Sequence, residues 1–274
     1  MISFLIKPKI LQVEVTNDCN CNCDICLRNY WKRPKGSISV EDFKKLPIKD
    51  FKEVALHGWG ESFLHPNLFE MVKYVKSLGV KASLCTNGTL LDERLDEVLN
   101  SGLDEIAFGI FSLKGKEKVI SNIEMLINEK EKKGLKLDTY IDITMFRRNL
   151  EEIPEIVEAG INLGVDGIVL HRLFDLYIEE KYGLSSKEEK KFINDLIEKY
   201  GKKIRIYPPL PHTTPCRILL NCMFVRWDCQ QSPCVYLTDD TLGDARTTYK
   251  QMKDRHISFI KKVKLNDICR KCIW

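Results

Sequence analysis

Several features that would restrict this 274-residue chain to a particular class of protein are missing from its sequence. No stretch approaches the roughly 18 apolar residues of a membrane-spanning helix. The first apolar run, Met1 to Ile6, is too short for a secretion signal. Charge of one sign is also lacking, because 43 Lys and Arg against 39 Asp and Glu leave a net charge of only +4. These absences predict a cytoplasmic protein without a membrane partner, and they do not favour nucleic acid as a partner.

Cysteine, by contrast, is abundant. Eleven cysteines are unusual in a reducing compartment unless they bind metal or take part in chemistry. A chain of this length can bury roughly 75% of its unfolded surface, so it does not need disulfides for stability. The length fits one large α/β domain of about 250 residues with an appendage.

Four of these cysteines fall in one short stretch directly after the apolar run 10–15, which predicts a β-strand. Cys19, Cys23 and Cys26 are spaced C-x3-C-x2-C, and Cys21 lies between them. Three thiolates from one loop can hold three irons of a 4Fe-4S cluster, which leaves the fourth iron open to another ligand. Zinc, which prefers four ligands in pairs such as C-x2-C, is the alternative that the loop alone leaves open.

Strands and helices alternate from residue 10 to residue 200. The pattern predicts strands at 10–15, 53–57, 80–85, 105–111, 137–146 and 165–170, and helices at 68–78, 91–99, 119–133, 153–159 and 186–200, the last capped by Ser186. Such alternation predicts parallel βαβ units, here a partial (β/α)6 TIM-like barrel. Ligands bind at the carboxyl ends of the strands in such sheets. We therefore expect the cysteine loop, residues 58–61 and 86–88, Ser112, Arg147 and His171 to surround one mouth.

Three prolines within 208–211 interrupt the pattern, because proline cannot continue a helix or a central strand. We predict a domain boundary here, with one domain at 1–207 and a second at 208–274. Six of the eleven cysteines follow this boundary. Cys216, Cys234, Cys269 and Cys272 supply four thiolates, which would complete either a second 4Fe-4S cluster or a zinc site.

Gly58, Trp59, Gly60 and Glu61 follow the second predicted strand. Glycines allow a backbone to approach a ligand closely, and a carboxylate can accept hydrogen bonds from an amine. A G-x-G turn after a strand is also common without any ligand. His57, His65 and His171 are candidate acid/base groups because imidazole titrates near neutrality, although most such histidines are packed or exposed.

Together, the three-cysteine loop, the glycine-glutamate turn one strand later and the terminal cysteines resemble the radical S-adenosylmethionine (SAM) superfamily. The turn is similar to the GxGEP-like segment of that family, with Ser62 where proline is usual. The resemblance implies that Cys19, Cys23 and Cys26 hold a cluster whose free iron binds SAM, and that the turn contacts the SAM amino group. It also implies SAM contacts for Ser112, Arg147 and the backbone of Leu170.

The segment from Phe224 to Cys234 resembles the hairpin of SPASM and Twitch domains, which are auxiliary-cluster modules of radical SAM enzymes. Glycine usually stands there in the place of Cys229. The resemblance implies an auxiliary 4Fe-4S cluster held by the four terminal cysteines already named. Cys222 is a ligand in full modules and could replace one of them. Cys21, Cys85 and Cys229 have no assigned role, and a buried thiol is the default for each.

The resemblance further implies an oxidoreductase or maturase. Reduced ferredoxin or flavodoxin would supply an electron, and SAM would be cleaved to methionine and a 5′-deoxyadenosyl radical that abstracts a substrate hydrogen. The auxiliary cluster would accept the electron left on a peptide, cofactor-precursor or small-molecule substrate, giving oxidation or cross-linking. A tRNA-modifying enzyme is an alternative, but the basic run 261–264 is short for that role. A zinc-binding interaction protein on an α/β scaffold is the second alternative.

Overall fold

The computed structural model describes residues 7–31, 33–178 and 182–272, which divide into two compact units. The first unit contains the described residues up to Leu84, together with 100–103 and 212–272. The second contains residues 85–99 and 104–211. These units do not follow the predicted boundary between residues 207 and 208, which stays a prediction. Within the described residues, no helix is both long and apolar enough to cross a membrane.

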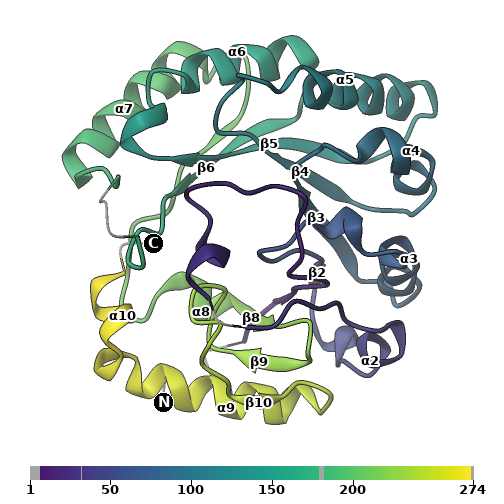
Figure 1. The fold of residues 1–274 in the computed structure, drawn as a ribbon, viewed down its shortest axis with the longest axis vertical. Helices are drawn as coiled ribbons and strands as arrows, with labels where there is room; N and C mark the ends of the chain where they lie inside the picture. Colours follow the sequence, from purple (N-terminus) through teal and green to yellow (C-terminus); the bar gives the residue numbers. More distant parts are fainter. Residues whose placement is uncertain (1–6, 32, 179–181, 273–274) are drawn as a thin grey trace. The chain divides into compact units, whose positions relative to one another are not determined.

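The first unit is built on a sheet in which residues 222–225 lie beside residues 10–13 (Figure 1). Its strand order is β10-β9-β8-β1-β2-β3, and the last two residues of β3 belong to the second unit. The bounds are β1 Ile10–Val13, β2 Glu53–Ala55, β3 Lys81–Thr86, β8 Cys222–Val225, β9 Gln230–Ser232 and β10 Gly243–Asp244. Strand β1 pairs in parallel with both β2 and β8, so that Leu11 lies opposite Val54 on one side and Met223 on the other. The hairpin of β8 and β9 is antiparallel.

Short helices connect the strands of the first unit. They are η1 Leu27–Tyr30, α2 Val40–Lys44, η2 Ile48–Asp50, η3 Ser62–Leu64, α3 Leu68–Ser77, α8 Arg217–Asn221, α9 Tyr249–Lys262, η5 Val263–Leu265 and α10 Asp267–Lys271. The Ser39 hydroxyl accepts the Asp42 N–H and so fixes the start of α2. Helix α3 ends before Gly79, whose φ of 72° is a left-handed conformation that glycine adopts without strain.

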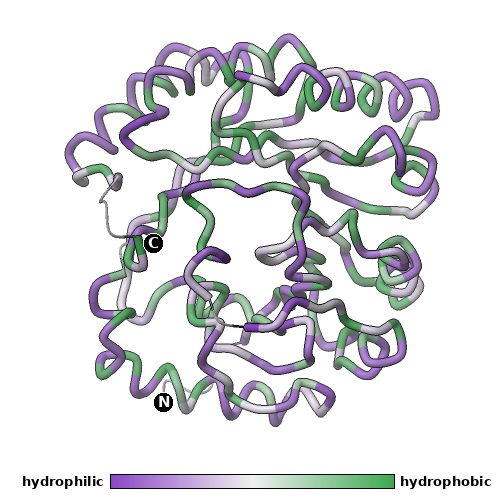
Figure 2. The backbone as a smooth tube through the Cα atoms, in the orientation of Figure 1, coloured by the Kyte–Doolittle hydropathy of each residue, from purple (hydrophilic) through white to green (hydrophobic). Residues whose placement is uncertain are grey.

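The second unit is a parallel sheet in the order β4-β5-β6-β7 with helices between its strands. Its strands are β4 Glu105–Gly109, β5 Asp138–Met145, β6 Gly167–Arg172 and β7 Ile206–Tyr207. Its helices are α4 Leu91–Leu99, α5 Glu117–Lys132, η4 Arg147–Asn149, α6 Ile153–Leu163 and α7 Ser186–Tyr200. Hydrophilic and hydrophobic residues alternate around these helices, as Figure 2 shows.

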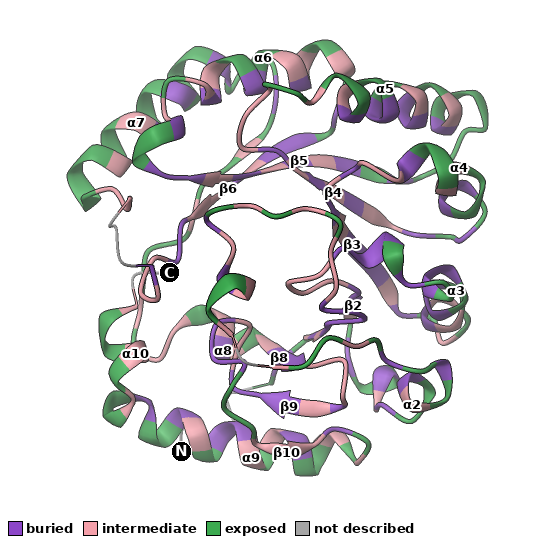
Figure 3. Ribbon diagram, viewed as in Figure 1, coloured by how far each residue is buried: buried purple, intermediate pink, exposed green. Residues whose placement is uncertain are grey.

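Helix α6 illustrates how the helices pack on this sheet. Its buried residues Ile153, Ile156, Val157 and Gly160 recur at helical spacing and form one face. A Cβ on Gly160 would lie 2.9 Å from the Ile168 side chain, so the missing side chain allows α6 to approach β6 closely. Figure 3 shows the resulting buried faces of the helices and strands in this unit.

The predicted alternation is confirmed, and the fold class is α/β with a parallel sheet. One predicted detail is wrong, because α7 is capped by Ser185 and not by Ser186. The Ser185 hydroxyl accepts the Glu188 N–H at 3.3 Å, and the Glu188 carboxylate accepts the Ser185 N–H at 2.9 Å. A reciprocal capping box places a serine three residues before a glutamate, and Ser186 with Glu189 has the same spacing as Ser185 with Glu188, so spacing alone could not identify the cap.

Candidate active site

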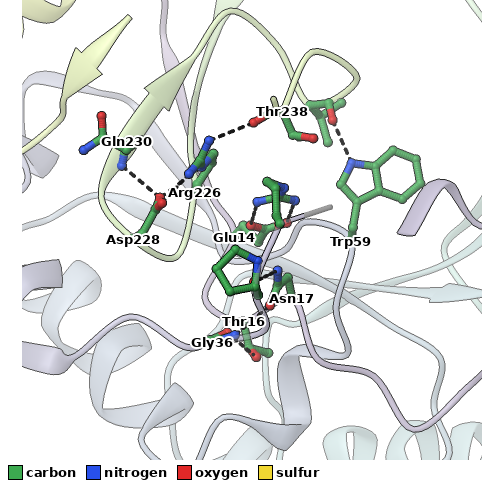
Figure 4. A network of polar contacts seen from close by, with 12 residues as sticks. Glu14, Thr16, Asn17, Gly36, Trp59, Arg226, Asp228, Gln230 and Thr238 are labelled. Carbon is green, nitrogen blue, oxygen red and sulfur yellow. Dashed lines mark hydrogen bonds and ion pairs between the residues drawn. The ribbon is translucent and has the colours of Figure 1, made fainter. Parts of the chain in front are cut away.

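The cysteine loop leaves the end of β1, and buried polar contacts hold both of its ends. Glu14 and Arg33 form two hydrogen bonds of 2.8 and 3.0 Å, with side chains 0% and 6% exposed. Asn17 donates to the Pro34 carbonyl at 2.9 Å and accepts the Gly36 N–H at 2.8 Å (Figure 4). The residues before and after the predicted ligands are therefore fixed to one another.

Within the loop, backbone amides point at two of the predicted ligand sulfurs. The Cys21 N–H donates to Cys19 Sγ at 3.4 Å, and the Arg28 N–H donates to the Cys26 sulfur. Burial raises the pKa of the Cys26 thiol, and the nearby Cys19 raises that pKa further. The Cys23 carbonyl accepts the Cys26 N–H at 3.1 Å, which closes the turn between these two cysteines. Amide donors of this kind stabilise thiolates in iron-sulfur sites.

The turn after β2 packs directly on this loop. A Cβ on Gly58 would lie 2.6 Å from the Glu14 Cβ, and a Cβ on Gly60 would meet the Thr16 and Asp18 carbonyl oxygens. The Glu61 N–H donates to the Asp18 carbonyl at 2.8 Å. Both glycines are therefore required for the close approach of the turn to the cysteine loop.

Glu61 places a buried carboxylate beside the cysteine loop. The residue is 2% exposed, and Oε1 accepts the Phe63 N–H at 3.0 Å at the start of η3. Its carboxylate oxygens are strong acceptors for an ammonium group. The proposed contact of Glu61 with the SAM amino group stays a prediction.

Trp59 contacts the C-terminal part of the chain. Its indole Nε1–H donates to the Val235 carbonyl at 2.7 Å (Figure 4). Its ring meets the Trp31 and Tyr236 rings edge to face, at centroid distances of 5.2 and 5.8 Å. The indole N–H thus binds the segment that follows Cys234, and the predicted cofactor contact of Trp59 is untested.

The terminal cysteines gather around one small apolar cluster. Cys216, Cys234 and Cys269 pack against the buried residues Leu219, Ile257, Ile260 and Val263. The pKa of the Cys234 thiol is raised by burial and then by Cys269 and Cys216. Burial, followed by Cys272 and Cys216, raises the pKa of Cys269 to about 11. The four predicted auxiliary ligands are therefore neighbours, although the chain separates them widely.

Cys234 repeats the amide pattern of the first loop. Its sulfur accepts the backbone N–H groups of Tyr236 and Leu237. In Cys19, Cys26 and Cys234 alike, one donor is the amide two residues further along the chain. Three predicted ligands thus share one local geometry, which suits a thiolate.

Cys222 and Cys229 have different surroundings. Cys222 begins β8, its Sγ lies 3.9 Å from Gln12 Oε1, and burial raises its pKa to about 12, with Cys216 also nearby. Cys229 has a φ of 62°, which suits the glycine usual at this position in SPASM and Twitch hairpins. Burial raises its pKa to about 11, and the charges that affect this pKa come from Arg246, Asp42, Asp244 and Asp228.

The remaining predicted contacts lie in the second unit. The Ser112 hydroxyl accepts the Lys114 N–H at 3.3 Å. Arg147 forms two hydrogen bonds with Glu188, at 2.9 and 3.2 Å, so its guanidinium is already paired with a carboxylate. Leu170 is buried in β6 and lies opposite Ile143. The SAM contacts predicted for Ser112, Arg147 and Leu170 stay predictions.

Two of the candidate acid/base histidines, His65 and His171, have different surroundings. His65 is buried, and its Nε2 donates to the Ile38 carbonyl while Nδ1 accepts the Asn67 N–H. These bonds give His65 a structural role. His171 Nε2 lies 3.1 Å from Asp142 Oδ2 on the neighbouring strand. Burial lowers the His171 pKa, and Asp142 raises it by charge and hydrogen bonding, with a net increase.

The cysteines suit an iron-sulfur cluster by donor type and local geometry. Within the described ranges, no three or more His, Cys, Asp or Glu side chains are arranged around a single metal ion. In a 4Fe-4S cluster each thiolate binds a different iron, so its ligands need not converge on one point. The sulfur-directed amides and the neighbouring thiols fit the group that these cysteines would hold.

Several important residues were not predicted from the sequence, although two of them carry a sequence signal. Glu14 lies in an apolar strand pattern, and a charged residue there is a signal of a buried ion pair. Asp142 occupies an alternate position of β5, which is a signal for a polar sheet face. The contact between Trp59 and Val235 has no local signal, because 176 positions separate the two residues.

Parallel βα units, a cysteine loop after the first strand and a glutamate-bearing glycine turn after the second define an α/β iron-sulfur enzyme. The family model described as the Radical SAM superfamily matches residues 13–158, more than half of the chain. The chain belongs to this superfamily and is an enzyme. The predicted family is therefore confirmed, and membership implies SAM and a 4Fe-4S cluster as cofactors.

Two comparisons place the chain among its relatives. It is 28% identical over 251 residues to the tungsten-containing aldehyde ferredoxin oxidoreductase cofactor-modifying protein of Pyrococcus furiosus, covering 82% of this chain and 70% of that one. It is also 26% identical over 182 residues to the AdoMet-dependent heme synthase of Methanosarcina barkeri, covering 60% of this chain and only 50% of that protein.

Among solved structures, Streptococcus suis SuiB bound to its precursor peptide SuiA matches with a TM-score of 0.76 at 13% identity. The match covers 92% of this chain and 65% of SuiB, slightly less than two thirds of its length. At this identity the likeness shows the fold alone. It agrees with the partial barrel expected for radical SAM enzymes.

Proposed function

We propose that this enzyme reductively cleaves SAM and uses the resulting 5′-deoxyadenosyl radical to abstract a hydrogen atom from its substrate. The observation that carries the proposal is the packing of the Gly58–Glu61 turn against a cysteine loop whose sulfurs accept backbone amides. In this proposal Cys19, Cys23 and Cys26 hold the cluster. When bound, the cluster supplies the electron that cleaves SAM.

The protein's own contribution is binding and orientation. Glu61 would accept the SAM ammonium group, because its buried carboxylate lies beside the loop that holds the cluster. Gly58 and Gly60 would keep that carboxylate close to the loop. Ser112, Arg147 and the Leu170 backbone are the further SAM contacts proposed. Arg147 would have to release Glu188 to bind the SAM carboxylate.

Cys216, Cys234, Cys269 and Cys272 are proposed to hold an auxiliary 4Fe-4S cluster. The apolar cluster shared by Cys216, Cys234 and Cys269, and the effect of Cys272 on the pKa of Cys269, support this set over one that contains Cys229. With all four irons bound by protein, the auxiliary cluster would accept an electron from the substrate radical. The overall reaction would then be an oxidation or a cross-link.

The proposed substrate is a cofactor precursor, a peptide or another small molecule. The name of the Pyrococcus furiosus relative, a cofactor-modifying protein, supports the first class, and the peptide-bound SuiB structure supports the second. Reduced ferredoxin or flavodoxin is the proposed electron donor, in a cytoplasmic setting. The exposed basic residues Lys261, Lys262, Lys264 and Lys271, near the terminal cysteines, suit such an acidic protein.

Anaerobic reconstitution followed by reduction with dithionite in the presence of SAM tests the proposal. The wild-type chain should yield 5′-deoxyadenosine and methionine, and the Cys19→Ala/Cys23→Ala/Cys26→Ala variant should yield neither. Cys21→Ala is the matched control in the same loop and should retain cleavage. Intact SAM after incubation with reduced, brown wild-type protein would overturn the proposal.

A further inference from the structure

An aromatic contact joins the two sets of predicted cluster ligands inside the first unit. It consists of Trp31, Trp59 and Tyr236, with the hydrogen bond from Trp59 to Val235, and we refer to it as the Trp59 bridge. All four residues belong to the same compact unit. The bridge is distinct from the hydrogen bonds that fix each cysteine loop by itself.

Each end of the bridge is adjacent to a predicted ligand. Trp31 is the C-cap of η1, the turn of helix that begins directly after Cys26. Tyr236 supplies the amide that donates to the Cys234 sulfur, and Val235 lies between these two residues. The segment that follows Cys234 therefore contacts the indole of Trp59 directly.

The centre of the bridge is fixed just as firmly. Trp59 stands between Gly58 and Gly60, both pressed against the cysteine loop, and precedes Glu61. Trp31 also contacts Arg33, whose guanidinium carbon lies 4.3 Å from the ring centroid. Because Arg33 also pairs with Glu14, the bridge continues into the buried contacts at the base of the loop.

A rigid contact between two binding sites couples their occupancies, and the coupling acts equally in both directions. We propose that Trp59 is a positioning residue that couples SAM binding at the first cluster to occupancy of the terminal cysteines. Filling the terminal site orders the Cys234 loop, and the indole hydrogen bond then holds the Gly58–Glu61 turn in its SAM-binding position. This inference rests on the proposed function of both cysteine sets.

Equilibrium binding of SAM to anaerobically reconstituted protein tests the coupling. We would measure the SAM dissociation constant of the wild type, Cys269→Ser/Cys272→Ser, Trp59→Phe and the variant that combines these changes. Loss of the terminal site should weaken SAM binding by about tenfold in the wild-type background, within the usual range of coupling. In the Trp59→Phe background, the same loss should have little further effect. An equal loss in both backgrounds, or none in the wild type, would overturn the inference.

A spectroscopic signature separates positioning from general stability. Addition of SAM should change the paramagnetic resonance signal of the reduced terminal cluster in the wild type but not in Trp59→Phe. Trp227→Phe is the matched control. Trp227 lies in the hairpin of β8 and β9, its indole packs on Gly36, and it is not part of the Trp59 bridge. It should preserve both the signal change and the dependence of SAM affinity on the terminal site.

Two further measurements keep the outcomes distinct. The iron content of Trp59→Phe shows whether this variant still holds both clusters. If Trp59→Phe loses a cluster, Tyr236→Leu serves as the second variant. Tyr236→Leu retains the indole hydrogen bond to Val235 and should reduce the coupling. Wild-type protein that forms no iron-sulfur cluster contradicts the proposed function. Protein that forms both clusters but binds SAM independently of the terminal site contradicts only the role of Trp59.

Discussion

Individual residues without sulfur determine the geometry of the cysteine loop. Glu14 and Arg33 close its base with a buried, two-bond ion pair, and Gly58 and Gly60 allow the next turn to approach it. These residues contribute shape and charge compensation, while the cysteines contribute the ligands. Their replacement therefore tests the frame of the site separately from its metal chemistry.

Arg33→Met should destabilise the protein by about 3–5 kcal/mol, because it leaves the fully buried Glu14 carboxylate without its counter-charge. Urea unfolding under anaerobic conditions, followed by circular dichroism, measures this difference. The double variant Glu14→Gln/Arg33→Met should be less destabilised than the sum of the two single variants. A single variant as stable as the wild type would contradict the importance of this pair.

Gly60→Ala should weaken SAM binding by at least about tenfold, equivalent to about 1.4 kcal/mol. The added Cβ would meet the backbone oxygens of Thr16 and Asp18, so the turn that carries Glu61 must move. The iron content of the first cluster should remain, since no ligand changes. Gly109→Ala is the control, because its Cβ would come no closer than 3.8 Å to the Thr86 carbonyl. Unchanged SAM affinity in Gly60→Ala would contradict this account of the glycine.

Among the elements, the pair of strands β5 and β6 separates a buried face from a polar one. Ile141 and Ile143 are buried, whereas Asp142, which alternates with them, is only half-buried and meets His171 of β6. The polar pair links these strands through a charge that depends on pH. A pH experiment can therefore probe this pair of strands alone.

His171→Gln should cost more stability at pH 6 than at pH 9. The folded-state pKa of His171 is raised above its ordinary value of 6.5, because the effect of Asp142 exceeds that of burial. Its stabilising contribution is therefore complete below pH 6.5 and is lost as the pH rises through the folded-state pKa. Unfolding by urea at several pH values measures the difference between wild type and variant. The same difference should be absent when both proteins carry Asp142→Asn.

The sequence predicted the elements of the second unit well because their periods are clear. The alternation along β5 and the helical spacing in α6 are local signals that survive in the folded chain. The hairpin of β8 and β9 was recognised only by resemblance, and its pairing with β1 was not predicted. Strands of three or four residues carry little pattern, and the partner of β8 lies more than 200 positions away.

The site shows the same division between local and distant signals. The spacing of Cys19, Cys23 and Cys26 predicted their shared loop, and the glycines of the next turn predicted a close approach. That approach is made to the backbone of the loop itself. The amide that donates to Cys234 and the carbonyl that accepts from Trp59 depend on backbone conformation after folding, so residue types alone could not reveal them.

On the scale of the whole molecule, seven of the eleven cysteines form the two proposed sets of cluster ligands. Metal analysis can test each set by the number of irons bound per chain. The reconstituted wild type should contain about eight irons, and either Cys19→Ala/Cys23→Ala/Cys26→Ala or Cys216→Ser/Cys269→Ser should contain about four. Cys229→Gly should retain about eight, because this residue occupies a glycine conformation away from the other thiols. Zinc in the terminal site, or loss of all iron from either variant, would contradict two separate clusters.

The position of β1 between β2 and β8 also has a consequence for synthesis on the ribosome. One edge of β1 can pair soon after β2 emerges, but the other waits until residues 222–225 have been translated. During that interval an apolar strand has unpaired backbone groups along one side, which is a template for association with other chains. A nascent chain stalled before residue 222 should therefore require chaperones far more than a released chain that contains β8.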